Sequence, residues 1–285
     1  ETFQTLLEAT PLRVVIQGVT RFGSVDVQPD NTSPYHRWIY SIYADGRVYV
    51  ECSGTARTSS FEPEGIGVAF CVDRAFGFRR ILSEPRASAA SETAAYTLFT
   101  RTARGEADLL IAPYEPLPVR VLESAQDTRL CVLYPLNASG EHFSFAALLR
   151  VWPNDMDAAG QAAPMALDYQ HPLPIHMEAG QLVRTDAGDL DHDGFSEARG
   201  YYVIQLDGSI ARITIDGRKH LRFAPMFKLI DVAGRDVWVY IDGRQIRELQ
   251  RDADENVMFQ VPGIISRDAL LEITSRPRDA QSSLP

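Results

Sequence analysis

The sequence has no long apolar run and is short of positive charge. No stretch reaches the roughly 18 consecutive apolar residues that a membrane-spanning helix needs, so no membrane span is predicted. Lys and Arg number 28 against 38 Asp and Glu, which gives a formal net charge of −10. This balance argues against binding to nucleic acid and favours the binding of cations.

Cysteine is scarce as well. The chain has Cys52, Cys71 and Cys131, each in strand-like surroundings, and no CxxC spacing occurs. A zinc cluster built on cysteine is therefore not expected. The odd number prevents complete pairing, so the prediction is buried thiols that act as small hydrophobic side chains, with one disulfide as the alternative.

Familiar catalytic motifs are absent from the sequence. It contains no GxSxG nucleophile elbow, no phosphate-binding loop and no dinucleotide-binding fingerprint. A carboxylate pair for glycoside hydrolysis cannot be selected among 38 acidic residues by sequence alone. No catalytic residue is therefore assigned.

What is present is an alternation of apolar and polar residues with a period of two. In the segment RVYVEC, Val48, Val50 and Cys52 share one face of an expected strand. Asp-Gly pairs, whose glycine tolerates the positive φ of tight turns, separate such segments: Asp45-Gly46, Asp207-Gly208, Asp216-Gly217 and Asp242-Gly243. Residues 201–220 contain two of these pairs and predict a meander. Helical tendency is limited to two places: the Ala- and Glu-rich start of 88–100, whose end YTLFT is typical of a strand, and 266–273, where a capped turn is expected before a final strand.

These patterns predict an all-β protein made of two β-sandwich-type units with hairpin meanders and little helix. Residues 153–180 are rich in Pro, Ala, Gly and Asp and lack a clear period, so they are predicted to form an irregular connection. The first unit then covers 1–152, and the second, smaller unit covers 181–276 and opens with an acidic loop. Residues 277–285 form a polar tail.

The acidic loop is the segment GDLDHDGFSE, residues 188–197. Its aspartates fall at alternate positions, so their side chains can converge on one point, and Gly194 allows a sharp turn. A hard cation such as calcium takes six to eight oxygen ligands at about 2.3–2.6 Å. The predicted calcium ligands are the carboxylates of Asp189, Asp191, Asp193 and Glu197 and the carbonyl oxygen of Phe195.

The pattern distinguishes between two kinds of calcium loop. The helix–loop–helix hand needs a glutamate at the twelfth position, where this chain has Gly200, and the following YYVIQL is typical of a strand. The DxDxDGxxE pattern instead resembles the calcium loops of integrin-type FG-GAP repeats, with Glu197 in place of the usual aspartate. One copy does not imply a propeller. The alternative is an ion-free Asp/Gly turn, but four carboxylates within nine residues repel one another without a cation.

A second candidate site is the aromatic segment SPYHRWIYSIY, residues 33–43. Tyr35, His36, Arg37 and Trp38 are the side-chain types that stack on sugar rings and bind their hydroxyls. The alternative is that one face of this strand packs into the core.

Residues 11–73 carry a wider resemblance. The stretches TPLRVVIQGVTRFG, RWIYSIYADGRVYVECSG and EGIGVAFCVD resemble the β-supersandwich domains of polysaccharide lyases and related sugar-active proteins. The resemblance implies a carbohydrate-related extracellular β protein of bacterial type. The catalytic Tyr, His, Arg and Asn set of the lyases has no match here, so the resemblance implies no activity.

The function these observations predict is a secreted or cell-surface module that is stabilised by calcium and associated with polysaccharide recognition or processing, without catalysis of its own. One alternative is a polysaccharide lyase or glycoside hydrolase that uses Tyr35, His36 and Arg37. Another is an adhesin or filament subunit that assembles through edge strands. The expected partners are therefore a polysaccharide and copies of the chain itself.

Overall fold

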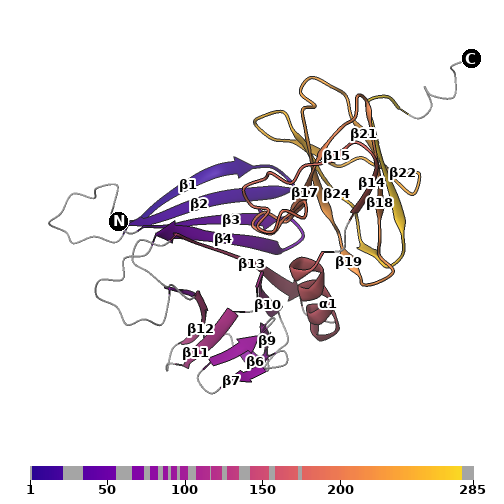
Figure 1. Cartoon of the computed structure of the whole chain (residues 1–285). Helices are drawn as coiled ribbons and strands as arrows, with labels where there is room; N and C mark the ends of the chain where they lie inside the picture. Colours follow the sequence, from indigo (N-terminus) through magenta and orange to yellow (C-terminus); the bar gives the residue numbers. More distant parts are fainter. Residues whose placement is uncertain are drawn as a thin grey trace, which may run out of the picture. The chain divides into compact units, whose positions relative to one another are not determined.

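A computed structural model of the chain describes residues 2–21, 35–55, 66–73, 78–82, 86–88, 91–94, 97–101, 107–115, 117–123, 127–134, 142–153, 158–172 and 175–277. Nearly all regular structure in these residues is β-strand, and α1 (Ala158–Gln170) is the one helix among them (Figure 1). This confirms the predicted all-β class. Among the described residues, no helix combines the length and apolar character that crossing a membrane requires.

The chain divides into two compact units. Unit 1 comprises Glu1–Leu7 and Val14–Ala166, and unit 2 comprises Glu8–Arg13 and Leu167–Pro285. The main division lies inside α1, within the range 153–180 that the sequence predicts to be a connection.

Unit 1 contains an eight-stranded sheet in the order β1-β2-β3-β4-β13-β10-β9-β6 and a five-stranded sheet in the order β5-β12-β11-β8-β7. The strands of the first sheet are β1 (Thr2–Ala9), β2 (Arg13–Arg21), β3 (Tyr35–Tyr43), β4 (Arg47–Thr55), β13 (His142–Pro153), β10 (Ala107–Pro113), β9 (Thr97–Arg101) and β6 (Phe78–Leu82). Those of the second are β5 (Ile66–Asp73), β12 (Asp127–Tyr134), β11 (Leu117–Glu123), β8 (Ser91–Ala94) and β7 (Arg86–Ser88).

The described core of unit 1 is centred on β4 and β13. Val50 pairs with Ala147 and Cys52 with Phe145, and all four side chains are buried. Burial raises the pKa of Cys52 to about 12, so it remains a thiol, as predicted for this residue. The side chains of Cys71 and Cys131 lie outside the described part of the chain, and their state stays a prediction.

Unit 2 is built from two main sheets and a short ribbon, and Figure 1 shows the two sheets as its layers. The first sheet has the order β14 (Ile175–Ala179), β18 (Ile210–Ile215), β26 (Ala269–Thr274), β21 (Trp238–Ile241), β22 (Arg244–Ile246). The second has the order β15 (Gln181–Leu182), β17 (Tyr201–Gln205), β20 (Met226–Ile230), β24 (Val257–Gln260), β23 (Leu249–Arg251), with β16 (Phe195–Ser196) also paired to β17. The ribbon pairs β19 (Arg222–Phe223) with β25 (Ile264–Ile265).

Two of the Asp-Gly turns form the predicted hairpins. Gly46 has φ +90° and closes the β3–β4 hairpin with a hydrogen bond from its N–H to the carbonyl of Tyr43. Asp242 and Gly243 both have positive φ, +46° and +81°, as a two-residue hairpin loop between β21 and β22 requires.

The meander predicted for 201–220 is wrong. The Asp207-Gly208 turn joins β17 to β18, but these strands lie in different sheets, and β17 pairs in parallel with β20. Burial agrees with this arrangement: Tyr201, Tyr202, Val203 and Ile204 are all buried, so both faces of β17 are covered, as is typical of parallel-paired strands and not of a hairpin strand with one solvent-exposed face.

Two predictions about helix are also wrong. Residues 153–180 contain α1 and β14 instead of irregular chain only, and the Ala- and Glu-rich part of 88–100 contains the strand β8 (Ser91–Ala94) instead of a helix, whereas the strand expected at its end is present as β9. The buried positions of α1 do follow a helical spacing: Ala162, Met165, Ala166, Tyr169 and Gln170. Small alanines give this spacing little contrast in hydrophobicity, and Pro164 inside the helix suggests a break, which is why the sequence pattern is misleading. At 88–100, strand pairing overrides the intrinsic preference of Ala and Glu.

An aromatic row crosses the second sheet of unit 2. The rings of Phe195, Tyr202, Phe227 and Phe259 follow one another with centroid distances of 5.1, 5.5 and 5.4 Å. These residues belong to β16, β17, β20 and β24, so the row connects the end of the acidic loop to the core of the sheet.

Candidate metal centre

The four carboxylates predicted to bind a cation lie together in unit 2. One oxygen from each of Asp189, Asp191, Asp193 and Glu197 lies within 4.8 Å of the others. Two ligands on opposite sides of a calcium ion are about 4.6–5.2 Å apart, so a cluster of this size fits one ion.

Each carboxylate of the cluster also holds part of the loop backbone. Asp189 Oδ2 accepts from the N–H of Gly194 at 2.9 Å, and Glu197 Oε2 accepts from the N–H of Leu190 at 2.8 Å. Asp191 and Asp193 each accept from the backbone N–H two residues later, at 3.1 and 2.7 Å. These bonds fix the four carboxylates in position within the loop.

Gly194 is required by the shape of the loop. Its φ is +100°, and a Cβ at this position would lie 2.3 Å from the Cδ2 atom of Leu182. Both the backbone conformation and the close approach to β15 therefore exclude a side chain. The sharp turn expected from the sequence is confirmed.

Two oxygens in the cluster are buried and accept no hydrogen bond from any described residue. They are Oδ1 of Asp189 and Oε1 of Glu197, and these side chains are only 3% and 0% exposed. A buried carboxylate oxygen without a partner is strongly unfavourable, because its desolvation is not compensated. A cation between the carboxylates would supply the missing interaction.

The electrostatics of the loop also favour a cation between the carboxylates. Burial raises the pKa of Glu197 to about 8 and that of Asp193 to about 6, and it also raises the pKa of Asp189. The charge of Asp191 adds to the effect at all three residues. Without a cation, the buried carboxyl of Glu197 keeps its proton near neutral pH, and a bound cation would replace that proton.

His192 and Phe195 lie in the same loop as the four carboxylates. His192 is exposed and its Nδ1 atom lies 3.3 Å from the carbonyl of Arg184, so it does not contribute to the cluster. Phe195 pairs with Tyr202 through its backbone, and the role of its carbonyl as a calcium ligand stays a prediction.

Asp186 closes the base of the loop, a role that the sequence did not reveal. Its Oδ1 accepts from the N–H of Gly188 at 2.9 Å and from the hydroxyl of Ser196 at 3.1 Å, and its Oδ2 lies 3.3 Å from Nη1 of Arg199. One carboxylate thus ties together the two ends of the loop. It stands outside the DxDxDGxxE pattern, which is why it was overlooked.

The helix α1 contributes two further supports. The hydroxyl of Tyr169 donates to the carbonyl of Glu197 at 3.2 Å, in a buried position. Asp168 accepts from Nε of Arg222 at 2.5 Å and from the N–H of Phe223 at 2.9 Å, and Arg222 in turn donates to the hydroxyl of Tyr202. Both links were missed because the sequence pattern indicated no helix here.

The aromatic segment is spread over both faces of β3. His36 and Trp38 lie on one face, where His36 packs edge-on against Phe143 at 5.3 Å. Arg37 lies on the other face, 3.8 Å from Glu51. The side chain of Tyr35 lies outside the described residues.

The structure therefore does not bring these candidates into one cluster. Trp38 stacks on Tyr40 with a centroid distance of 6.1 Å, and both are half-exposed. Contact of Trp38 and its neighbours with sugar stays a prediction.

Comparison with known proteins gives only weak similarities. No family model and no curated protein matches the sequence. Among solved structures, a protein from Escherichia coli K12 described as an aldose 1-epimerase is 10% identical, with a TM-score of 0.32, and the match covers 53% of this chain and 68% of that one. A polysaccharide lyase is 11% identical, with a TM-score of 0.30, and the match covers 93% of this chain and 36% of that one. At these scores neither protein's activity transfers to this chain.

Fold and site together define a class: an all-β protein with a four-carboxylate loop that is able to hold a metal ion.

Proposed function

We propose that the chain is a calcium-stabilised β-sandwich module that acts outside the cell or at its surface, in association with polysaccharide. The observation that carries the calcium assignment is the pair of buried, unpartnered oxygens of Asp189 and Glu197 inside a four-carboxylate cluster. All the side-chain ligands are oxygens, as a hard cation prefers, and calcium tolerates irregular coordination better than the smaller magnesium ion.

The role of the ion is structural in this proposal. The loop lies between β15 and β17, its carboxylates hold its own backbone, and Phe195 at its end packs into the aromatic row. A bound ion would neutralise the carboxylates and keep this entry to the sheet ordered. An extracellular setting supplies enough calcium for a site of modest affinity.

The first prediction concerns the loss of one ligand. Asp191→Ala is expected to fold, because Asp191 is exposed, but to lose the calcium-dependent rise in melting midpoint that the parent protein shows at about millimolar calcium. Calorimetric titration and thermal melting measure the two effects. Asp236→Ala, which removes another exposed carboxylate outside the loop, is the matched control and should behave like the parent. A parent midpoint that does not respond to calcium would rule out the site.

Association with polysaccharide is the second part of the proposal. A half-exposed pair of stacked rings, Trp38 and Tyr40, and the exposed Ile42 on the same strand face of β3 favour it, since sugar rings stack on such surfaces. Affinity electrophoresis against a panel of glycans tests it. Retardation without turnover supports a binding module, release of new reducing or unsaturated ends indicates an enzyme, and calcium-dependent assembly without either indicates a structural subunit.

A further inference from the structure

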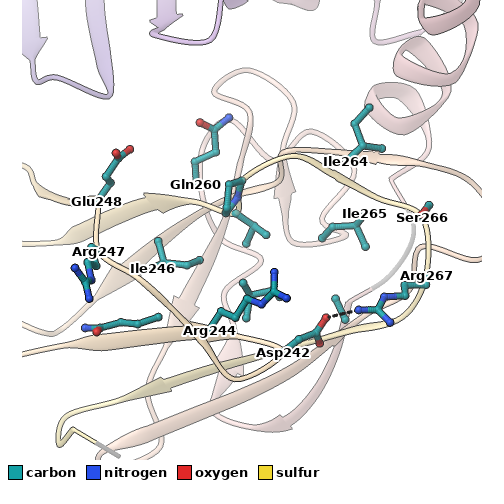
Figure 2. Close-up of a pocket in the computed structure, with 15 residues that line it drawn as sticks. Asp242, Arg244, Ile246, Arg247, Glu248, Gln260, Ile264, Ile265, Ser266 and Arg267 are labelled. Atoms are coloured by element: carbon teal, nitrogen blue, oxygen red, sulfur yellow. Dashed lines mark hydrogen bonds and ion pairs between the residues drawn. The ribbon is translucent and has the colours of Figure 1, made fainter.

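Unit 2 contains a cleft that is distinct from the acidic loop. It has a volume of about 780 Å³ and is lined by two segments, 241–248 and 260–269 (Figure 2). Its floor is apolar, because Ile246, Val261 and Ile265 are buried there. The size falls within the range of about 300–1,000 Å³ that is typical of sites for small ligands.

The cleft carries positive charge without full compensation. Arg267 lies 3.5 Å from Asp242, so this pair is internally neutralised. Arg244 and Arg247 are exposed, and no described carboxylate forms an ion pair with either of them. In Figure 2, Arg244 extends into the middle of the cleft, while Glu248 points away from Arg247.

This charge stands out against the rest of the molecule. The cleft is lined by three arginines against two carboxylates, Asp242 and Glu248, so it has a formal excess of one positive charge in a chain whose net charge is −10, and this local excess favours anions. A guanidinium offers a planar pair of donors that matches a carboxylate or sulfate group. Half-exposed Ile264 (49%) adds an apolar wall on which the C–H face of a sugar ring can pack.

We propose that this cleft binds a short segment of an anionic polysaccharide, with Arg244 and Arg247 as the groups that bind its carboxylates or sulfates. The proposal rests on the proposed association with polysaccharide and names the class of ligand. A protein partner is less well suited, since β22 at the edge of its sheet is only Arg244–Ile246 and offers few backbone groups to an added strand.

The test uses the full chain with calcium held constant. Binding of a galacturonic acid oligomer, a sulfated glycan oligomer, a neutral dextran oligomer and a poly-glutamate peptide is measured by titration calorimetry. We expect an acidic glycan to bind, and Arg244→Gln and Arg247→Gln to weaken it about tenfold or more each, as the loss of a charge-assisted hydrogen bond predicts. Lys219→Gln removes one exposed positive charge outside the cleft and should leave the affinity unchanged. Arg244→Lys keeps the charge but loses the planar pair of donors, so it should give an intermediate affinity.

The remaining outcomes contradict the cleft proposal alone or the association with polysaccharide as well. Acidic glycan binding that is insensitive to both arginine variants, equal binding of dextran, or tighter binding of poly-glutamate overturns the cleft proposal. In the first two cases the association with polysaccharide survives. If no glycan binds at all, that association fails together with the cleft, whereas the calcium site is judged separately by the melting experiment.

Discussion

In the presence of a chelator, the protein is expected to lose stability steeply as the pH rises from about 5 to about 8, and calcium is expected to abolish this loss. Burial raises the pKa of Glu197 from 4.5 to about 8. Between these values the folded chain keeps a proton that the unfolded chain has released, so stability present at low pH is lost as the pH rises through the folded pKa. At about 1.4 kcal/mol per pKa unit, the loss is on the order of 4 kcal/mol. Asp193, with a pKa of about 6, acts in the same direction.

Calcium bound at the loop would remove this dependence, because it would keep the carboxylates charged in the folded state. Urea unfolding at a series of pH values, with calcium and with chelator, measures the difference. Glu197→Gln supplies the control: it keeps an acceptor for the N–H of Leu190 but does not titrate, so its stability in chelator should vary much less with pH. An identical slope with and without calcium would contradict the assignment of the loop.

The second large effect is expected from Asp168→Ala. This change removes the carboxylate from Nε of Arg222, whose side chain is only 2% exposed, and also removes the acceptor for the N–H of Phe223. Breaking a buried ion pair on one side typically costs about 3–5 kcal/mol, because a charge stays buried without its counter-charge. Chemical denaturation of the variant and the parent measures this loss.

Two further variants test whether the loss of stability comes from breaking the buried ion pair. Glu178→Ala also removes a carboxylate, one that accepts from Oγ1 of Thr214 at 3.0 Å in an exposed position, and should cost about 1 kcal/mol or less. Asp168→Leu combined with Arg222→Met replaces both partners by apolar groups and should recover much of the stability. If Asp168→Ala were no more damaging than Glu178→Ala, the buried pair would not support the fold.

Local features of the fold could be predicted from the sequence, whereas the pairing of distant strands could not. The hairpins at Gly46 and Gly243 depend on a turn and the few residues around it, so their signal is contained in a short segment. The parallel pairing of β17 with β20 depends on burial from both faces of the sheet, which no local pattern reports. The helix α1 was missed because its buried face includes two alanines and a glutamine, which give little hydrophobic contrast, and because Pro164 lies inside it.

The same distinction applies to the sites. The four carboxylates lie within nine residues, and their backbone bonds are made inside the loop, so alternate spacing was sufficient to predict the cluster. Tyr169 reaches the loop from another element, and no spacing in the sequence connects it to Glu197. The arginine cleft is assembled from two segments that sheet packing brings together, and it was not foreseen for that reason.

The hydrogen bond from Tyr169 to the carbonyl of Glu197 couples two equilibria: the ordering of the last turn of α1 and the binding of an ion by the acidic loop. Leu167–Gln170, the last turn of α1, belongs to unit 2, and it is hydrogen-bonded to a loop that, in the proposal made above, is ordered by a bound ion. By reciprocity, whatever free energy an ion contributes to ordering this turn, an ordered turn contributes equally to the affinity for the ion. The surrounding calcium concentration would then determine both whether the loop holds an ion and how stable the last turn of α1 is.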